Sequence, residues 1–435
     1  MKSDFSNLKA LYINCTLKAS PRMSHTEALM NVSMDIMKAE NVSVEYLRFV
    51  DHEVAYGVYH DMTEHGAKKD VWPTLWKKTL GEGWATPVVT EGKVVIHHRP
   101  GAEESIDCLD ASLGKLLWRH SFTSGYRDGF GMAEGPRSTP TITEAKVFTY
   151  GPQGILNCLD FTTGKLKWTV DMAKQFRSPK GFFGRCCSPL VVDKLVMLDA
   201  GGPGAGVVAF DMETGKAVWR ATDHENDYSS PAFTTIDGVS CSLFFNRDGF
   251  LALEAKTGRR LFFERFRSPI NASVNAATPL VVGDSVFVSS CYDVGGAVWK
   301  LKSDGKGGVS TQTIWKKGGS IDSHYATAVH HDDYLYGFHG RQERGPELRC
   351  VSLGDGSVKW TSGRMSAGNL ILADGKLLIL TEADGTRNES TQLLGREVFA
   401  RIVQALKAGG KLQAQHGTFG QDTASVESRE AIMAG

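Results

Sequence analysis

The stretch CLDFTTGKLKW, residues 158–168, carries the motif that decides the fold of this chain. Its Asp160 can accept hydrogen bonds from backbone amides further along the turn, and Gly164 can adopt the positive φ that a tight hairpin needs. Trp168 then lies on the following strand, where its large apolar ring can lock neighbouring sheets together. The segment therefore predicts a β-hairpin with an aromatic anchor.

Copies of this motif recur along the chain, which indicates a repeat architecture. They are CLDASLGKLLW at 108–118, AFDMETGKAVW at 209–219, ALEAKTGRRLF at 252–262 and CVSLGDGSVKW at 350–360. A second landmark is a proline at the start of an apolar strand, spaced 42 to 53 residues apart at Pro87, Pro140, Pro189, Pro231 and Pro279. Four-stranded units of this length predict a mainly β fold, a six-to-seven-bladed β-propeller over residues 72–385 whose last blade is incomplete.

Composition narrows the possible functions. Lys plus Arg and Asp plus Glu both number 49, so the formal charge is zero and argues against a nucleic-acid partner. No apolar run approaches the roughly 20 residues of a membrane span. Residues 1–10 show no signal peptide, so a cytoplasmic location is expected. The eight cysteines lack zinc-binding spacing, which predicts buried thiols and no metal site.

The motif LDxxTGKxxW, with GPRSTPT at 135–141, resembles the pyrroloquinoline-quinone-like, or quinoprotein-type, β-propeller repeat family. That resemblance implies a propeller, and the family includes both dehydrogenases and scaffolds without cofactor. The dehydrogenases stack the quinone on a disulfide between adjacent cysteines and bind calcium through a Glu, Asn and Asp set. Cys186 and Cys187 are an adjacent pair, but they stand where other repeats have small buried residues. No calcium set aligns, so pyrroloquinoline quinone is not expected.

Other polar residues of the propeller region have structural and functional interpretations. The run of His330, His331, Asp332 and Asp333 predicts a solvated turn rather than a metal site. His97, His98 and Arg99, together with Arg127 and Asp128, could face the central channel and bind a ligand there. Arg137 and Arg185 stand at equivalent repeat positions, so we expect them to form hydrogen bonds between blades.

Residues 1–71 follow a different pattern. An apolar strand is predicted at 8–15, a helix at 27–40 and a second strand at 42–49. The apolar helix positions expected to pack on the sheet are Leu29, Val32, Ile36 and Met37. Strand, hydroxyl-rich loop, helix and strand form a βαβ unit, and the start of its helix is a candidate anion site.

NCTLKASPRMSHTEAL at 14–29 and LRFVDHEVAYGV at 47–58 resemble the opening of flavodoxin-like NAD(P)H-dependent FMN reductases. By that resemblance the FMN phosphate would be bound by Thr16, Lys18, Ser20, Ser24, His25 and Thr26. An ordinary helix cap is the alternative interpretation. Propeller sequence begins by about Leu80, where the family has further loops for the flavin ring. A phosphate cradle alone would bind FMN weakly, because little of the ligand would be buried.

Residues 386–435 do not continue the repeat. Apolar positions predict a helix at 393–408, which Gly409 and Gly410 would end. The stretch from IVQALKAGGKLQAQHGTFG to ESREAIMAG resembles the methyltransferase-like domain of the fungal anamorsin family, which serves cytosolic iron–sulfur assembly. The cluster-binding cysteines of that family lie beyond this domain, and the last cysteine here is Cys350, so no cluster is expected.

The sequence thus predicts a mosaic of three parts, 1–71, 72–385 and 386–435. The function that we expect is a non-catalytic binding or scaffold module, with a small-molecule or protein ligand at the channel face and no catalytic residue that can be named. One alternative is an FMN-dependent NAD(P)H oxidoreductase that uses the N-terminal loop. A second is a quinone-dependent dehydrogenase built on Cys186 and Cys187, and a third is that the parts are fragments without a joint function.

Overall fold

The computed structural model of this protein describes residues 8–14, 20–48, 51, 76, 78–130, 133–373 and 376–381. The chain divides into two compact units, Met1–Thr74 and Leu75–Met433. The helix expected at 393–408 lies outside the described residues.

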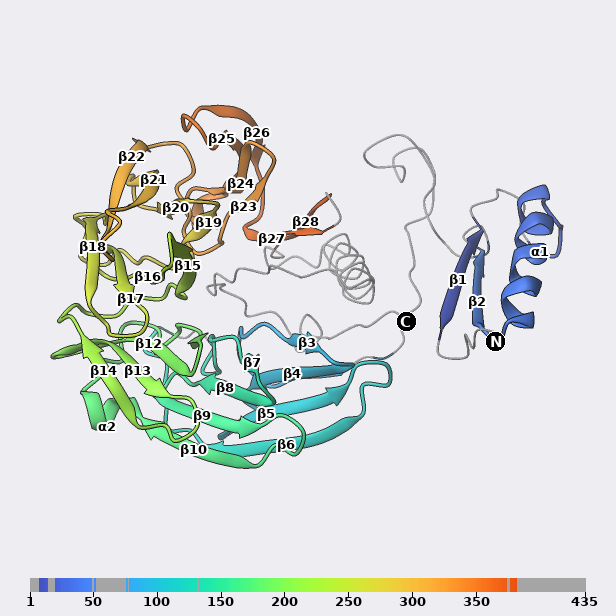
Figure 1. Ribbon diagram of the computed structural model, residues 1–435, viewed down its shortest axis with the longest axis horizontal. Helices are drawn as coiled ribbons and strands as arrows, with labels where there is room; N and C mark the ends of the chain where they lie inside the picture. Colours follow the sequence, from blue (N-terminus) through green and yellow to red (C-terminus); the bar gives the residue numbers. More distant parts are fainter. Residues whose placement is uncertain are drawn as a thin grey trace. The chain divides into compact units, whose positions relative to one another are not determined.

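The N-terminal unit is a βαβ arrangement, as the sequence predicts. Strand β1 (Lys9–Asn14) pairs in parallel with β2 (Ser43–Arg48), and helix α1 (His25–Ala39) connects them (Figure 1). Ser24 caps the helix, since its hydroxyl accepts a hydrogen bond from the Glu27 amide while the Glu27 carboxylate accepts one from the Ser24 amide. This reciprocal capping box fixes where α1 begins.

The prediction of which side of α1 packs on the sheet is wrong. Leu29 is 74% exposed, and Val32 and Ile36 are exposed as well, whereas Met34 is buried. Two strands offer a narrow surface, so only one flank of the helix can reach it. The apolar stripe of α1 therefore faces away from β1 and β2.

Among its described residues, the second unit contains six four-stranded antiparallel sheets, which confirms a mainly β fold. The first sheet is β3 (Val88–Thr90), β4 (Lys93–His98), β5 (Glu103–Asp110) and β6 (Leu116–Thr123). The second is β7 (Thr141–Thr143), β8 (Lys146–Tyr150), β9 (Ile155–Asp160) and β10 (Leu166–Asp171), followed by a short helix α2 (Met172–Phe176). The third is β11 (Leu190–Val192), β12 (Leu195–Gly202), β13 (Ala205–Asp211) and β14 (Ala217–Ala221).

The remaining sheets repeat this plan. The fourth is β15 (Ala232–Ile236), β16 (Val239–Phe245), β17 (Gly249–Glu254) and β18 (Arg260–Arg265). The fifth is β19 (Leu280–Val282), β20 (Ser285–Ser290), β21 (Gly295–Ser303) and β22 (Val309–Lys317). The sixth is β23 (Val329–His331), β24 (Tyr334–His339), β25 (Glu347–Ser352) and β26 (Val358–Arg364), with a 3-10 turn at Gln342–Arg344. A two-stranded sheet of β27 (Gly368–Ala373) and β28 (Lys376–Thr381) follows.

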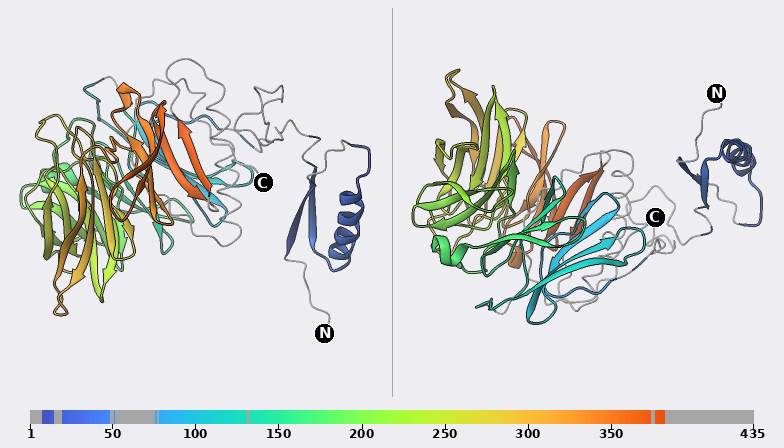
Figure 2. Two further views of the ribbon diagram at one scale, coloured as in Figure 1. Left: turned by 90° about the horizontal axis from the view of Figure 1, so that it is seen from above. Right: turned by 60° about the horizontal axis from the view of Figure 1, so that its bottom comes forward.

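Successive sheets are neighbours through their first strands. Strand β7 contacts β11, and the series continues through β15, β19, β23 and β27. The sheets follow one another along a curve in chain order, which is the arrangement of propeller blades (Figures 1 and 2). Because each sheet is a meander, the segments that join sheets and the turns between second and third strands lie together at one end, here called the loop end. The other turns form the hairpin end.

Tryptophan rings join most neighbouring sheets at the hairpin end, whereas the fourth sheet carries Phe262 at the corresponding position of the motif. The Trp118 indole lies over Gly164 of the second sheet, and its Nε1–H donates to the Phe161 carbonyl at 2.9 Å. A Cβ on Gly164 would come within 2.5 Å of that ring, so glycine is required there, and its φ is +70°. Equivalent pairs are Trp76 with Gly114, Trp168 with Gly215, Trp219 with Gly258 and Trp315 with Gly356.

Hydroxyl groups join the first strands near the centre of the unit. The Thr139 amide donates to Ser188 Oγ at 3.0 Å, and the Ser188 amide donates to Ser230 Oγ at 3.1 Å. The same bond links Thr86 to Thr139 and Thr278 to Thr327. The Ser or Thr before each strand thus satisfies a buried amide of the preceding sheet, which explains why small hydroxyl residues recur at this position of the repeat.

We predict that Trp118→Ala lowers the stability of the propeller unit by about 3–5 kcal/mol, because the substitution leaves a cavity and an unpaired carbonyl between two sheets. The exposed hairpin residue Leu113 provides the control, and Leu113→Ala should change stability by less than about 0.5 kcal/mol. Urea unfolding followed by circular dichroism measures both. Equal effects of the two substitutions would contradict this role of the indole.

Candidate functional site

Three phenylalanines form an aromatic patch at the loop end. Phe130 lies between the first and second sheets and is 58% exposed, and Phe182 and Phe183 lie between the second and third. The Phe130 ring centroid is 5.2 Å from that of Phe183 and 6.0 Å from that of Phe182. These residues are far apart in the sequence, and the sheets beneath them bring their loops together.

The aromatic patch rests on a buried tyrosine. Tyr228, between the third and fourth sheets, packs its ring 5.6 Å from that of Phe183. Its hydroxyl accepts a hydrogen bond from the Phe182 amide at 2.7 Å. The Arg247 guanidinium lies 5.8 Å above the Phe182 ring. The patch is therefore held by contacts from three loops.

A cavity of about 400 Å³ is lined by residues close to the patch in sequence. Its walls are Gly125, Tyr126, Arg127, Gln153, Lys180 and Arg185. The Lys180 ammonium lies 5.0 Å from the Tyr126 ring centroid and also donates to the Arg127 carbonyl. Arg127 forms an ion pair with Glu134 at 3.0 Å, and its side chain is largely exposed. Three cationic side chains thus line a cavity formed by the loops that also carry Phe130 and Phe182.

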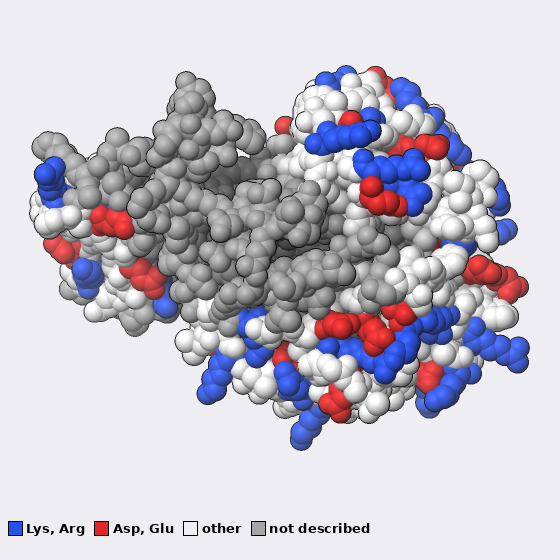
Figure 3. Space-filling model, turned by 180° about the vertical axis from the view of Figure 1, so that it is seen from behind, with Lys and Arg blue, Asp and Glu red and all other residues white. Residues whose placement is uncertain are grey.

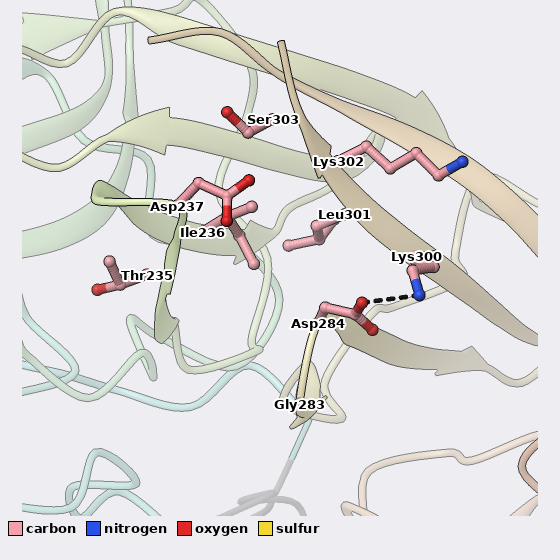
Figure 4. Close-up of a pocket in the computed structure, with 9 residues that line it drawn as sticks. All are labelled: Thr235, Ile236, Asp237, Gly283, Asp284, Lys300, Leu301, Lys302 and Ser303. Carbon is pink, nitrogen blue, oxygen red and sulfur yellow. Dashed lines mark ion pairs between the residues drawn. The ribbon is translucent and has the colours of Figure 1, made fainter. Parts of the chain in front are cut away.

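A second pocket lies at the hairpin end between the fourth and fifth sheets (Figure 4). Its polar lining includes Asp284 and Lys300, whose charged groups are 2.8 Å apart. Both side chains are about half exposed, so water screens the pair and it adds little stability. Figure 3 shows basic and acidic side chains interspersed over the described part of one face.

The adjacent cysteines are buried free thiols at the approach to the third sheet. Burial raises the pKa of Cys186 to about 12 and the pKa of Cys187 well above its usual value. The Cys187 thiol donates a weak hydrogen bond to the Asp199 carbonyl oxygen, with Sγ and the oxygen 3.5 Å apart. This environment is the one expected for small buried residues at this repeat position.

The expectation that His97 and His98 face a channel is wrong. Both are buried on β4, where His97 Nε2 lies 3.2 Å from Glu104 and His98 Nε2 lies 3.3 Å from Asp107. Burial by itself would raise the pKa of Asp107, but hydrogen bonds from Arg119 and His98 lower it to about 2. Carboxylates on the neighbouring strand β5 therefore bind these histidines inside the first sheet.

Hydrogen bonds between blades were expected for Arg137 and Arg185, and they form for Arg185, whereas Arg137 bonds within its own connecting segment. Arg185 donates to the Gln153 carbonyl of the second sheet at 2.9 Å while it approaches the third. Arg137 donates to the Ala133 carbonyl, and its guanidinium lies 4.7 Å from the Trp84 ring centroid. Arg99 also binds backbone, since it donates to the Ser124 and Tyr126 carbonyls.

The run from His330 to Asp333 ends in a turn, as expected, whereas the channel position of Arg127 and Asp128 stays a prediction. His330 and His331 end β23, and Asp332 and Asp333 form the exposed turn before β24. Arg127 lines the cavity formed by the loops of the aromatic patch, so it is the channel candidate that the fold brings to a possible ligand.

Only part of the expected FMN loop is described. Thr16 and Lys18 lie outside the described residues, as does the side chain of His25, and Thr26 is exposed. The Ser20 amide donates to Asp51 Oδ1 at 2.8 Å, and the Ser20 hydroxyl bonds to the other oxygen of the same carboxylate. The Ser24 hydroxyl accepts from the Glu27 amide.

FMN binding by this loop stays a prediction, and the described contacts show which groups would compete with a phosphate there. The Asp51 carboxylate occupies the two donors of Ser20 that a phosphate would need, and Glu27 adds a second negative charge at the start of α1. Arg48, the nearest described cation, already bonds to Glu27 and to Ser20. Like charges repel, so this arrangement opposes a bound dianion. The helix-cap interpretation accounts for Ser24.

Sequence analysis missed the aromatic patch. Its residues stand in the segments between repeats, where no periodic pattern marks them. The one available signal was the pair of large aromatic residues, Phe182 and Phe183, in a loop otherwise rich in glycine and charge. Aromatic residues exposed on loops are typical of binding surfaces.

A family model described as outer membrane protein assembly factor BamB matches residues 102–362. The chain belongs to this family. A second model, described as the N-terminus of the Fe-S cluster assembly protein DRE2, matches residues 369–435, which lie mostly outside the described residues.

Curated relatives match separate parts of the chain. BamB of Burkholderia pseudomallei is 26% identical over 275 residues, which cover 53% of this chain and 70% of that protein. The Fe-S cluster assembly protein dre2 of Neurospora crassa is 51% identical over 61 residues, 14% of this chain and 18% of that protein. The divalent metal cation transporter MntH of Mycobacterium bovis is 51% identical over 76 residues, 18% of this chain and 11% of that protein. The chain thus spans less than a fifth of the length of the last two.

Among solved structures, BamB of Moraxella catarrhalis is 19% identical, with a TM-score of 0.41 over 57% of this chain and 67% of that one. Within the described ranges, no helix has both the length and the apolar character to span a bilayer. The same ranges contain no group of three or more His, Cys, Asp or Glu side chains placed to bind a metal ion.

We predict that Cys186 and Cys187 resist alkylation by iodoacetamide in the native protein at pH 8, because burial keeps both thiols protonated and inaccessible. After unfolding in urea both should react fully, as mass spectrometry of the alkylated peptides would show. A disulfide between them would contradict this prediction and favour the quinone-dependent alternative. Labelling of either thiol in the native protein would contradict their burial.

We also predict that the purified, undialysed protein shows no flavin absorption band, because Asp51 occupies the Ser20 donors. Asp51→Ala frees these donors and provides a comparison with added FMN. A near-stoichiometric flavin band, lost when Ser24→Ala and Thr26→Ala are combined, would contradict the prediction and restore the FMN reductase hypothesis.

Proposed function

We propose that the propeller is a non-catalytic protein-binding module whose partner docks on the aromatic patch at the loop end. The observation that carries this proposal is the exposure of Phe130 and Phe182 on loops held in place by Tyr228. Membership of the BamB family, whose description names outer-membrane protein assembly, supports a function in binding proteins.

The chemistry of the patch suggests which partner fits. Exposed aromatic rings gain free energy when a partner covers them, and such residues often dominate an interface. Arg127 and Lys180 line the cavity formed by the same loops, so a partner that carries carboxylates would complement them. We therefore propose that the patch binds an extended protein segment in which apolar and acidic side chains alternate.

Several polar groups of the described propeller residues are engaged in structural contacts. Asp107 holds Arg119 and His98 inside the first sheet, and burial raises the pKa of Cys187. Each of these contacts stabilises the blades, which is consistent with a scaffold.

The proposed location of the protein depends on its partner. The description of the family names the outer membrane, and segments of outer-membrane β-barrels alternate apolar and polar side chains as the patch requires. A cytoplasmic location stays a prediction from the sequence, and this partner class favours a location outside the cytoplasm.

The test is a fluorescence anisotropy titration of a labelled peptide that copies one strand of an outer-membrane β-barrel. Combining Phe130→Ser with Phe182→Ser should weaken binding at least about tenfold, since a central aromatic contact contributes about 2 kcal/mol or more. The control is Leu113→Ser, which changes an exposed apolar residue at the hairpin end. Circular dichroism checks that each variant remains folded. Binding that the double variant leaves unchanged, or that Leu113→Ser weakens equally, would overturn the proposal.

A further inference from the structure

The segment that joins the third and fourth sheets, residues 222–231, takes part in a buried network of acidic groups. His224 Nε2 lies 2.8 Å from Asp199 Oδ1, and His224 Nδ1 lies 2.9 Å from Thr222 Oγ1. The Asp227 amide donates to the other oxygen of Asp199 at 3.4 Å. The side chains of His224 and Asp199 are 7% and 2% exposed, and Asp227 is 3% exposed. The network is thus shielded from water, where each charge and each polar atom needs a partner.

The contacts of His224 require one proton more than a neutral imidazole and an ionised carboxylate have together. Thr222 donates its hydroxyl hydrogen to the Ala221 carbonyl at 2.6 Å, so it can only accept from His224 Nδ1. The other ring nitrogen faces Asp199, which can only accept when it is ionised. Either the imidazole carries both hydrogens or Asp199 carries one. In both cases the bond between His224 and Asp199 depends on a bound proton.

Asp227 is the second group whose surroundings favour a bound proton. Its Oδ2 accepts from the Asn275 amide at 2.8 Å, but within the described ranges no hydrogen-bond donor reaches its Oδ1. The cost of burying an oxygen without a donor is larger when the carboxyl group is ionised. Burial raises the pKa of Asp227 well above its usual value, and the charge of Asp199 adds to this effect. Asp227 therefore keeps its proton at a pH at which exposed carboxyl groups have lost theirs.

The other titratable and charged groups that face this network keep one charge state near neutral pH. They are Tyr150, Cys186, Cys187, Tyr228, Arg247, Arg267 and Tyr292. Burial raises the pKa of each of these tyrosines and thiols, so all of them stay neutral. The Arg247 guanidinium donates to the Ser273 carbonyl at 2.6 Å, and that of Arg267 lies 3.6 Å from Asp248. A response to pH therefore belongs to the acidic network itself.

This network supports the tyrosine beneath the aromatic patch. Asp227 accepts a hydrogen bond from the Asn275 amide, and the Tyr228 amide donates to the Asn275 carbonyl at 3.1 Å. The Tyr228 hydroxyl in turn accepts from the Phe182 amide. Water that enters to solvate an ionised Asp227 would compete for the bonds to Asn275, and Tyr228 would lose its support. The protonation of the network thus reaches Phe182 through one residue.

We propose that residues 222–231 form a pH-sensitive latch, whose bound protons keep Tyr228 bonded to the loop of Phe182. The imidazole–carboxylate pair holds one of these protons, and Asp227 holds the other. A group that binds its proton more tightly in the folded state stabilises that state at low pH and loses the effect as the pH rises. Both parts have this sign, so the latch opens as the pH rises. The latch is independent of the proposed binding function, and only its consequence, weaker partner binding at higher pH, rests on that function.

Amide hydrogen exchange of the full-length protein, resolved by mass spectrometry of peptides that contain Phe182, tests the latch. After correction for the intrinsic pH dependence of exchange, protection should fall more than about tenfold between pH 5.5 and pH 8.5, since one linked proton changes an equilibrium by up to about tenfold per pH unit. Asp199→Asn should remove most of this pH dependence, because the side-chain amide can donate to a neutral His224 and still accept from the residue 227 amide. Asp227→Asn should reduce the pH dependence as well, because its side chain stays neutral at every pH.

The control is Asp284→Asn, the same substitution at a half-exposed carboxylate of the hairpin end, which should leave the pH dependence intact. Circular dichroism at the lower pH checks that each variant remains folded. Protection that is constant with pH in the unmodified protein would overturn the proposal, as would a pH dependence that neither Asp199→Asn nor Asp227→Asn reduces. Peptide binding that stays constant while protection falls would support the latch and contradict the aromatic patch as the docking site.

Discussion

The contact on which the propeller depends is an indole ring lying flat on a glycine of the next sheet. An indole is wide enough to cover the turn, and its N–H satisfies a carbonyl that the turn leaves unpaired, as Trp118 does for Phe161. Only glycine permits this approach, because any Cβ would enter the ring. This contact positions the second, third, fourth and sixth sheets on the sheet before each of them. Hydroxyl-to-amide bonds such as that between Thr139 and Ser188 form a second link between sheets.

Because these links are made within the sheets and at the hairpin end, the loops at the other end are free to carry a binding surface. Phe130 and Phe182 come from different loops, and they meet because consecutive sheets hold those loops side by side. The buried Tyr228 fixes the loop of Phe182 from below. A rigid scaffold that presents exposed aromatic residues loses little conformational entropy on binding, which suits a protein whose family is described by assembly of other proteins.

The N-terminal unit shows which features local sequence can form. The parallel pairing of β1 and β2 and the capping box of α1 need only local sequence, and both form. The two described strands cannot cover both flanks of the apolar helix α1, so Leu29 is exposed. The capped loop likewise resembles a phosphate site in sequence, yet Asp51 occupies the Ser20 donors.

The sequence by itself determined the repeat, the hairpins with their glycines, the arginine bonds of Arg185 and the buried character of Cys186 and Cys187. Each of these follows from local turn chemistry or from a position that recurs in every unit. Only the tertiary structure decided the rest. It paired His97 and His98 with carboxylates across a strand, and it exposed the apolar stripe of α1. It also gathered Phe130, Phe182 and Phe183, because contacts between loops of different sheets depend on how the sheets pack and leave no periodic signal in the chain.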